Sequence, residues 1–546
     1  MGSAASPAGS IHATQSTRVS EIINRGIMTF LPTLSPVWRN NIITSQGVGS
    51  MSGVGRDLKI LKVFMGSFAG VFEPGGPKLD FPLYGDPAAG SNATVGNTLN
   101  LQNVSQVFPN PLEGPFSQPN RLGIGMRSMV ANLAITLGEM TADDLDALVG
   151  QILAPKYEGF ARLIAHTMCN YWYLNQNSNY ALCNVATANV VTNSWDVGTT
   201  TWTFTFTPSN LAIDRFFPGQ RLDFYSSANS LLNTNGGRFA VYVTSVDELK
   251  CRVTCKSANL NGFAGSPAAV PADITGTVTT QAATGTGIQV VYANSAGASG
   301  TPWSATSPYF TGIAGINSWL KGGSGGNDNY LLGDERDTSN QVDVTVHPQF
   351  KSFTRNHGGV AMTEHDLRKI VLRFLAAKRK YGQDVDTMVA SEGVWLAYEA
   401  TKIGRELIDR TGRLSNMNNE GSAEGFTFTV DGKTLKGITD SYVESGTIYM
   451  FKRGGNNWKR YVPPMIKGGK RLEGLEAFIP FEFIGAALNG NSSIQIPIQR
   501  VSSNQAVTQV TEGFQLPGML RMQLVPDQPA GVKITNVAED RLYSDN

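Results

Sequence analysis

The chain has 546 residues, of which 41% are hydrophobic and 16% are charged, and its 44 basic and 43 acidic residues leave a net charge of +1. This length is enough for several domains with large hydrophobic cores, and the low charge favours association. A protein that mainly grips DNA carries a basic excess, because phosphate neutralisation supplies most of the affinity, so we do not expect a dedicated nucleic-acid reader. The 59 glycines and 26 prolines predict a chain rich in loops and strands.

The N-terminal region predicts an arm and a long excursion. Residues 1–17 are small and polar and are predicted to be disordered, and the residues that follow suggest a short amphipathic helix. Between residues 70 and 125, prolines and glycines recur every few positions, which predicts an exposed excursion of loop or paired strands. The sequence shows no secretory signal and no apolar run long enough to cross a membrane, so we expect no membrane span and folding in a reducing cytoplasm.

One long helix is predicted over residues 141–175. Thr141 and Asp144 have the spacing of a capping pair, and Pro155 then breaks or kinks the helical pattern. The part after Pro155, about 20 residues and roughly 30 Å long, continues the apolar pattern. Its apolar positions are Phe160, Leu163, Ile164, Met168, Tyr171, Trp172 and Leu174. We expect these side chains to form the buried face of the helix.

From residue 184 to about 346 the composition changes. Charged residues become sparse, and Thr, Asn, Gly and Val dominate. Trp202, Phe204 and Phe206 alternate with threonines, which predicts a half-buried strand. The glycine-rich segment 322–326 is predicted to be a flexible loop. This region is interpreted as a β-rich insertion that interrupts a larger domain.

A capped helix, a strand, a second helix and a β-hairpin follow one another between residues 359 and 464. Thr363 and Asp366 form a capping pair at the start of the first helix, and Gly382 stands where a left-handed C-terminal cap belongs. The apolar stripe of this helix is Leu367, Ile370, Val371, Phe374 and Leu375. Residues 386–390 are then predicted to be a short buried strand.

The second helix of this segment is predicted over residues 392–402, with Ser391 as its cap. Its inner face would carry Val394, Trp395, Tyr398 and Ile403. The hairpin turns at Asp431-Gly432, and residues 447–451 are predicted to be a buried strand. Further strands are predicted at 478–488, 494–498, 520–524 and 532–537.

The four cysteines are predicted to be buried structural thiols. They are Cys169, Cys183, Cys251 and Cys255. Cys251 and Cys255 flank three residues of an expected strand, so they would share one face but lie too far apart for an easy disulfide. This pair offers too few ligands for zinc, and no histidine neighbours it in sequence, so we expect neither a metal site nor a cofactor.

No motif in the sequence makes a positive case for catalysis. The histidines are His12, His166, His347, His357 and His365. His357 and His365 have acidic neighbours in sequence, yet no nucleophile elbow accompanies them. His166 shares a helical face with Cys169, and a structural histidine beside a core thiol is favoured there over a catalytic pair.

Three other segments invite a binding interpretation that their spacing does not support. Gly47–Gly53 lacks the dinucleotide-binding spacing, and the loop at 322–326 lacks the Gly-Lys-Ser/Thr ending of a phosphate cradle. Asp334, Glu335 and Asp337 could ligate calcium, but they do not match the twelve-residue calcium loop, and a solvated turn is favoured. We therefore expect that the protein is not an enzyme.

The order of these parts resembles the major capsid proteins of tailed bacteriophages, of the Hong Kong 97 type. The most specific match is residues 367–398, and residues 310–336 and the hairpin ending at 447–451 are also similar. The resemblance implies an α+β subunit with a Hong Kong 97-like capsid fold and a β-rich insertion domain. It implies an N-terminal arm (1–57), an extended loop (58–125), a peripheral domain with a long spine helix (126–183), the β-rich insertion (184–346), an axial domain (347–480), and returning strands of the peripheral domain with a C-terminal tail (481–546).

The function that this resemblance implies is self-assembly. Copies of the chain would form hexamers and pentamers of the icosahedral head shell that encloses the double-stranded DNA genome, and the protein would reside in the virion. Scaffolding, portal and decoration proteins would be its partners, and packaged DNA would be contacted non-specifically. Some family members crosslink a loop lysine to a neighbour's asparagine. Lys59, Lys62 and Lys78 lie near the loop but do not match that chemistry.

Three other interpretations stay open at this point. The Thr-, Asn- and Gly-rich β segment also suggests a phage tail, fibre or adhesin protein, although the two capped helices argue against it. An encapsulin-like compartment shell of the same fold would enclose cargo enzymes in place of a genome. The last alternative is an enzyme whose site the sequence does not reveal.

Overall fold

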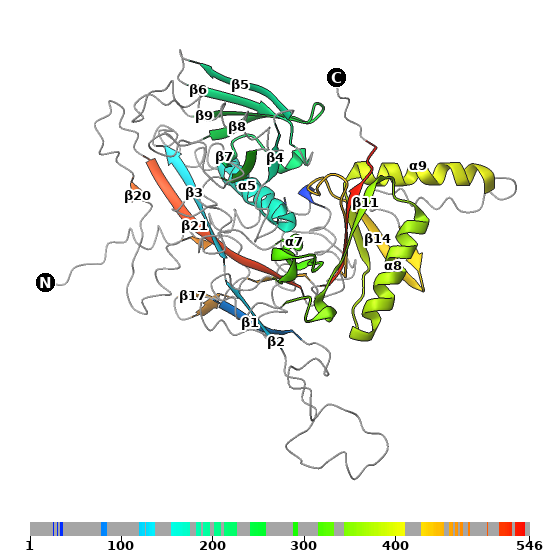
Figure 1. Ribbon diagram of the computed structural model, residues 1–546. Coiled ribbons are helices and arrows are strands. Elements are labelled where there is room, and N and C mark those ends of the chain that lie inside the picture. The colour runs from blue at the N-terminus through cyan, green and yellow to red at the C-terminus, as the bar shows by residue number, and fades with distance from the viewer. Residues whose placement is uncertain are drawn as a thin grey trace, which may run out of the picture.

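The computed structural model shows a mixed helix-and-strand chain with β-rich parts (Figure 1). The residues that it describes are 26, 30, 33–35, 78–83, 120–125, 127–136, 154–174, 182–186, 189–196, 201–208, 212–225, 241–257, 288–292, 315–331, 343–409, 427–452, 458–461, 465–467, 470–472, 479–480, 499–500, 513–526 and 530–540. Within them, no helix is both long and apolar enough to cross a membrane.

A seven-stranded sheet forms most of the region interpreted as an insertion. Its strands, in spatial order, are β4 (Cys183–Val185), β10 (Ile288–Tyr292), β7 (Arg221–Tyr225), β8 (Val241–Asp247), β9 (Arg252–Ser257), β6 (Thr201–Phe206) and β5 (Val190–Asp196). Every neighbouring pair is antiparallel. The alternation in β6 is confirmed, because Trp202, Phe204 and Phe206 are each 0% exposed while the threonines between them are half-buried. Their rings pack against the ring of Phe224 in β7, and the ring centroids of Phe204 and Phe224 lie 5.5 Å apart. One face of this sheet therefore has an aromatic core.

A six-stranded sheet is built by the later part of the chain. Its strands, in spatial order, are β11 (Phe353–Val360), β22 (Val532–Val537), β15 (Ile448–Phe451), β12 (Thr387–Ala390), β14 (Lys433–Thr439) and β13 (Thr427–Val430). The pairs β11–β22 and β12–β14 are parallel and the others are antiparallel. The predicted strands at 447–451 and 532–537 are confirmed.

The placement of β22 differs from the expectation for the final strands. The resemblance implied that the strands predicted at 520–524 and 532–537 would both return to the peripheral domain. β21 (Gly513–Pro526) does pair with β3 (Arg127–Thr136), but β22 lies between β11 and β15 of the six-stranded sheet. Val532 and Ile534 are fully buried there, so hydrophobic burial accounts for the position of β22. The division of the chain into domains stays a prediction.

Two helices accompany the six-stranded sheet, α8 (Glu364–Lys378) and α9 (Glu392–Asp409). The Thr363 hydroxyl accepts a hydrogen bond from the Asp366 amide at 3.2 Å, so the predicted cap is confirmed. The predicted stripe of α8 is buried in one hydrophobic cluster with Met388 and Met450 of the sheet. Gly382 has a left-handed φ of 70°, and a short 3₁₀ turn, η10 (Arg379–Tyr381), precedes it.

Helix α9 is longer than the 392–402 predicted from the sequence. Its inner residues Val394, Trp395 and Tyr398 are buried as expected, and the Trp395 indole donates to the Ile438 carbonyl at 2.9 Å. The hydroxyl of Ser391, which directly precedes the helix, donates to the Glu539 carboxylate. The residue predicted to be a cap therefore connects α9 to the segment that follows β22.

The hairpin that follows α9 is formed by β13 and β14, with Asp431 and Gly432 at the turn in left-handed conformations. β15 does not belong to this hairpin, because it pairs with β12 on one side and β22 on the other. The hairpin therefore joins the six-stranded sheet through the pairing of β14 with β12, and β15 joins the sheet on the other side of β12.

Helix α5 (Ala154–Tyr173) lies between the two sheets (Figure 1). It begins at Ala154, so Pro155 falls in the first turn, where a helix needs no backbone donor. The capping pair predicted at Thr141 and Asp144 lies outside the described residues. The stripe is buried at every predicted position except Leu163, which is 37% exposed, so the prediction is wrong there.

The base of the long excursion is a pair of antiparallel strands, β1 (Lys78–Leu83) and β2 (Asn120–Gly125). β21 also pairs with the short strands β16 (Trp458–Tyr461), β19 (Ile479–Pro480) and β20 (Gln499–Arg500), while β17 (Met465–Lys467) pairs with β18 (Lys470–Leu472). The strand predicted at 520–524 is confirmed as part of β21. Those predicted at 478–488 and 494–498 lie mostly outside the described residues.

Candidate functional site

Buried and half-buried polar side chains join α5, the seven-stranded sheet and the six-stranded sheet; we call this set the polar junction. Its members are Ser35, His166, Asn170, Tyr173, Arg215, Asn317, Asp440, Tyr442, Glu444, Tyr449 and Lys533. Buried polar groups are costly unless they are hydrogen-bonded, so such a set fixes the relative position of the elements that contribute to it.

Asp440 is the acidic centre of the polar junction. It follows β14 and is 1% exposed. Its carboxylate accepts hydrogen bonds from the Tyr173 hydroxyl at 2.7 Å, from the Tyr442 amide at 3.0 Å and from the Ser35 hydroxyl. Burial raises the pKa of Asp440 to about 6, although the hydrogen bonds from Ser35 and Tyr173 oppose this shift. Asp440 thus holds both α5 and a residue of the N-terminal region to the six-stranded sheet.

His166 is the imidazole of the polar junction. Its Nδ1 lies 2.6 Å from the Tyr442 hydroxyl, and its ring stacks on Phe217 with 5.0 Å between centroids. Burial lowers the pKa of His166 to about 4, and the nearby Arg162 acts in the same direction. His166 is therefore neutral near pH 7 and is satisfied structurally, as the sequence predicts.

Arg215 is the buried cation of the polar junction, at 1% exposed, in the 3₁₀ turn η6 (Ile213–Arg215). Its guanidinium donates to the carbonyls of Tyr442 and Leu182, both at 3.0 Å, and lies 3.8 Å from the Glu444 carboxylate. The Asn170 amide of α5 donates in turn to the Arg215 carbonyl at 3.0 Å. One side chain thereby connects the seven-stranded sheet with the 440–444 segment.

Asn317, in the short helix α7 (Ile316–Trp319), continues the polar junction toward β15 and β22. Its amide donates to the Tyr173 carbonyl at 2.6 Å and bonds with the Tyr449 hydroxyl at 2.8 Å. The Lys533 ammonium of β22 donates to the Asn317 side-chain oxygen at 2.7 Å. The polar junction therefore runs from the N-terminal region to β22.

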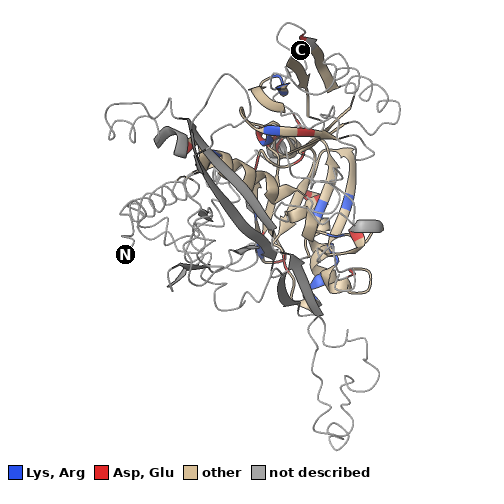
Figure 2. Cartoon of the chain, turned by 90° about the vertical axis from the view of Figure 1, so that its left-hand side faces the viewer, with Lys and Arg blue, Asp and Glu red and all other residues tan. Residues whose placement is uncertain are grey.

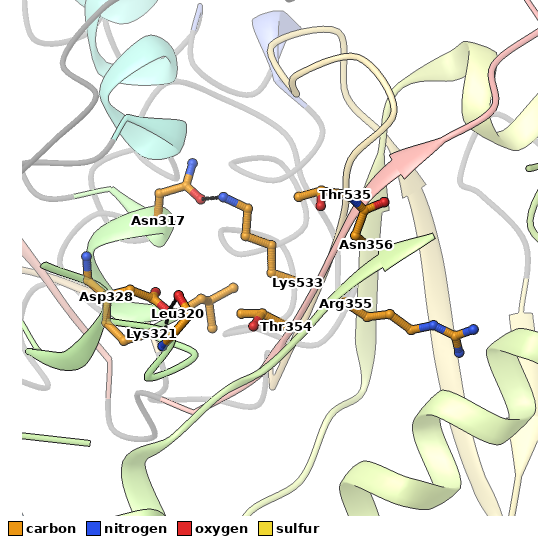
Figure 3. A pocket seen from close by; sticks show the side chains of 10 residues that line it. Asn317, Leu320, Lys321, Asp328, Thr354, Arg355, Asn356, Lys533 and Thr535 are labelled. Carbon is orange, nitrogen blue, oxygen red and sulfur yellow. Dashed lines mark hydrogen bonds between the residues drawn. The ribbon is translucent and has the colours of Figure 1, made fainter. Parts of the chain in front are cut away.

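A pocket of about 310 Å³ opens where the Lys533 end of the polar junction meets the surface. It is lined by Asn317, Leu320, Lys321, Ser324, Asp328, Thr354, Arg355, Asn356, Lys533 and Thr535. In Figure 3 the Lys533 side chain reaches Asn317, whereas the Arg355 guanidinium points away from the pocket, toward α8. Polar groups from three separate segments of the chain therefore converge on this pocket.

Charged residues of the described part lie scattered among uncharged ones in the view of Figure 2. Several exposed charges are paired locally, as in Arg368–Glu364 at 2.8 Å and in the Arg379–Asp431 and Lys433–Asp384 pairs. This distribution agrees with the net charge of +1.

The other histidines do not form a catalytic cluster within the described residues. His365 is exposed on α8, His357 lies on β11, and His347 directly precedes η9 (Pro348–Phe350). Asp366 serves the helix cap, and the hydrogen bond from the Thr363 hydroxyl, at 2.5 Å, lowers its pKa below the ordinary value. The described part of the chain holds no group of three or more His, Cys, Asp or Glu side chains suited to a metal ion.

All four cysteines are free and buried, as predicted. Burial raises the pKa of Cys169, Cys183 and Cys255, so these thiols stay protonated near neutral pH. The prediction that Cys251 and Cys255 share a strand is wrong. β9 begins at Arg252, and Cys251 ends the preceding turn with a φ of 51°.

The glycine-rich loop differs from its prediction as a flexible loop. The Asp328 carboxylate accepts bonds from the backbone amides of Gly322 at 3.1 Å and Ser324 at 2.9 Å, and from the Ser324 hydroxyl at 2.7 Å. Burial alone would raise the pKa of Asp328, but these hydrogen bonds outweigh it and lower the pKa below the ordinary value. The loop is therefore held around one carboxylate.

Of the other residues considered from the sequence, one lies in the part of the chain that the structure describes. Lys78 is the first residue of β1. The remaining ones lie outside the described residues: His12, Gly47–Gly53, Lys59, Lys62, Asp334, Glu335 and Asp337. The prediction that residues 1–17 are disordered also falls there.

Sequence reasoning missed the polar junction. Arg215 had one signal, because a charged residue in the run Ile213-Asp-Arg-Phe-Phe217 is unusual unless it is paired. Asp440 and Asn317 had none, since their partners Tyr173 and Tyr449 are distant in sequence. Isolated polar residues are ordinarily exposed, so only the tertiary fold identifies these two.

Comparisons with known proteins give little independent information. No family model matches the chain, and no curated protein matches it. Among solved structures, the chain is similar to a chain of the cyanophage A-1(L) capsid asymmetric unit, with 8% sequence identity and a TM-score of 0.33 over 90% of this chain and 95% of that one. A TM-score this low does not establish a shared fold.

Proposed function

We propose that this chain is the major capsid protein of a tailed bacteriophage, with a Hong Kong 97-type fold. The observation that supports the proposal is the order of its parts. A paired-strand base carries a long excursion, a 20-residue helix follows, an all-antiparallel sheet is inserted, and a helix–strand–helix–hairpin unit closes with a strand from residues 532–537. This order is the one on which the resemblance of the sequence to that family rests.

The proposed mechanism is assembly rather than chemistry. Identical subunits form hexamers and pentamers of an icosahedral shell around double-stranded DNA, with scaffolding, portal and decoration proteins as further partners. The excursion between β1 and β2 reaches a neighbouring subunit, while the polar junction keeps α5 and both sheets in register within each subunit. The low charge of the chain favours the large buried contacts that such a shell needs.

A non-enzymatic role is part of the proposal. The buried titratable groups of the polar junction are hydrogen-bonded to neighbouring structural groups, as Asp440 is to Tyr173 and His166 is to Tyr442. The burial of His166 and the three thiols keeps them uncharged near neutral pH, which suits packing better than general acid–base work.

The experiment is to express the whole chain alone and examine it by negative-stain electron microscopy and light scattering. Closed shells, tubes or hexameric rings are expected. A compact monomer under all assembly conditions would count against the proposal, rod-shaped trimers would favour a fibre protein, and shells that enclose protein cargo in place of nucleic acid would favour a compartment.

A matched variant tests the excursion directly. Replacing residues 84–119 by a two-residue Asn-Gly turn keeps β1 and β2 as a hairpin. We expect this variant to keep the thermal unfolding midpoint of the parent chain but to form no closed shells. The control replaces residues 232–237 of the insertion by the same turn, and assembly should survive this change.

A further inference from the structure

The 310 Å³ pocket has the construction of a binding site. Its walls come from the loop after α7, from β11 and from β22, which are distant in sequence. Gly322 allows the close approach of the first two walls, because a Cβ atom at this position would lie 2.2 Å from the Thr354 hydroxyl oxygen. The loop is also fixed by its hydrogen bonds to Asp328, so the pocket is formed before any ligand arrives.

Lys321 is the first unusual group in this pocket. It is only 2% exposed, and among the residues that the structure describes no hydrogen bond or ion pair reaches its ammonium group. Burial lowers the pKa of Lys321 to about 8; Asp328 opposes the shift and the Lys533 ammonium reinforces it. Burying an ammonium group is costly unless an anion compensates its charge, and the carboxylate that acts on Lys321, that of Asp328, is hydrogen-bonded to the loop, so the site can take a further anion.

Lys533 supplies the second positive charge. Its ammonium donates to the Asn317 oxygen at 2.7 Å and lies 5.7 Å from the centre of the Tyr449 ring. Asp328 is the one carboxylate that lines the pocket in the described part, and its two oxygens are already engaged by Gly322 and Ser324. The pocket therefore presents an excess of positive charge, and the hydroxyl groups of Thr354 and Thr535 add neutral donors.

We propose that this pocket binds a phosphate group, held by Lys321 and Lys533 with the hydroxyls of Thr354 and Thr535. Two ammonium point charges and hydroxyl donors suit a tetrahedral dianion. A carboxylate is best recognised by the planar fork of an arginine, and Arg355 points away from the pocket in Figure 3. The phosphate can belong to a nucleic-acid backbone or be free in solution. The proposal does not depend on the shell function.

Binding has a physical consequence for the sheet. The phosphate would bridge β22, β11 and the loop after α7, so its binding energy would oppose the separation of β22 from its neighbours. It would also return the pKa of Lys321 toward the ordinary value of 10.5, so binding takes up protons above about pH 8. Affinity for phosphate should therefore fall as pH rises from 8 to 10.

The first experiment titrates the whole chain with inorganic phosphate at constant ionic strength and follows the thermal unfolding midpoint, with chloride as reference. We expect a saturable rise, because a ligand that binds only the native state stabilises it. Lys321→Met and Lys533→Met should each weaken the apparent affinity at least tenfold, and the isosteric Thr535→Val several-fold. Lys369→Met, which removes one exposed charge from α8, should leave the affinity unchanged.

Three results would overturn the proposal. These are the absence of a saturable shift in the parent chain, an equal response of the parent and both lysine variants, and equal stabilisation by acetate and by phosphate. If a lysine variant fails to fold, Thr535→Val still decides, because it changes neither charge nor side-chain shape.

The second experiment identifies the source of the phosphate. A short fluorescently labelled DNA duplex is titrated with the chain and then with inorganic phosphate as competitor. Displacement by phosphate, together with weaker DNA binding by Lys321→Met, assigns the site to the nucleic-acid backbone. Phosphate binding without DNA binding at this site assigns it to free phosphate. Neither result depends on whether shells form.

Discussion

The two large sheets of this protein differ in strand direction and in how far apart in sequence their paired strands lie. The seven-stranded sheet is entirely antiparallel and takes all its strands from residues 183–292. The six-stranded sheet mixes parallel and antiparallel pairs and inserts β22, from residues 532–537, between strands of the 353–451 segment. The first sheet is a local structure held by an aromatic core, whereas the second is complete only when distant segments meet. We therefore expect the two sheets to unfold independently of each other.

The largest expected effect comes from a charge in the middle of the six-stranded sheet. Ile534 is fully buried in β22, and Ile534→Asp should cost more than about 4 kcal/mol, because it leaves an unpaired carboxylate in the core. Hydrogen exchange should then show loss of protection in β12 and β15 but not in β6 and β9. The control Ile534→Val should cost only about 1 kcal/mol. Loss of protection in both sheets together would show that they are one cooperative unit.

The converse substitution tests the seven-stranded sheet. Phe204 is 0% exposed and its ring packs against Phe206 and Phe224, so Phe204→Ala should destabilise this sheet by about 3–5 kcal/mol. Hydrogen exchange should accelerate in β6, β7 and β9 and stay unchanged in β12 and β15. Thr203→Ala, at a half-buried position of the same strand, provides the control and should have little effect.

The polar junction between the sheets predicts two opposing pH dependences. The folded-state pKa of Asp440 is raised from 3.8 to about 6, so the folded state binds more protons in that window and stability falls as pH rises through it. The pKa of His166 is lowered from 6.5 to about 4, so the unfolded state binds more protons and stability rises with pH. The two contributions oppose each other between about pH 4 and pH 6.

Urea unfolding of two variants at pH 4.5, 5.5, 6.5 and 7.5 separates these contributions. Relative to the parent chain, Asp440→Asn should gain stability with rising pH, by on the order of 2 kcal/mol over the window. His166→Gln should lose stability with rising pH, relative to the parent. Parallel profiles for the parent and both variants would contradict the burial of these two groups.

The smallest effect is expected at the start of α8. Thr363→Ala removes the hydroxyl that accepts the hydrogen bond from the Asp366 amide. This change should lower the stability of the six-stranded sheet by about 1 kcal/mol. Thr363→Ser retains the acceptor and should be nearly neutral. The protection of β12 and β15 against hydrogen exchange, followed as denaturant is added, measures both changes.

What the sequence predicts here depends on how local the cause is. The Thr363 cap, the apolar stripe of α8, the alternation in β6 and the burial in β15 each follow from neighbouring residues, and all are confirmed. The exposure of Leu163 could not be predicted, because it depends on what packs beside α5. The position of β22 and the partners of Asp440 could not be predicted either, since no local pattern specifies a strand or hydrogen bond across hundreds of residues.

The position of β22 also constrains how the chain is made. The ribosome synthesises β11 and β15 well before β22. In the nascent chain, the edges of β11 and β15 that pair with β22 therefore stay unpaired, with a slot one strand wide between them. On a crowded polysome, β22 of a second copy fits that slot as well as the chain's own strand does, and the product is a strand-exchanged dimer. Fast translation between the two regions, or a chaperone that covers the unpaired edges, would thus raise the yield of correctly folded subunits.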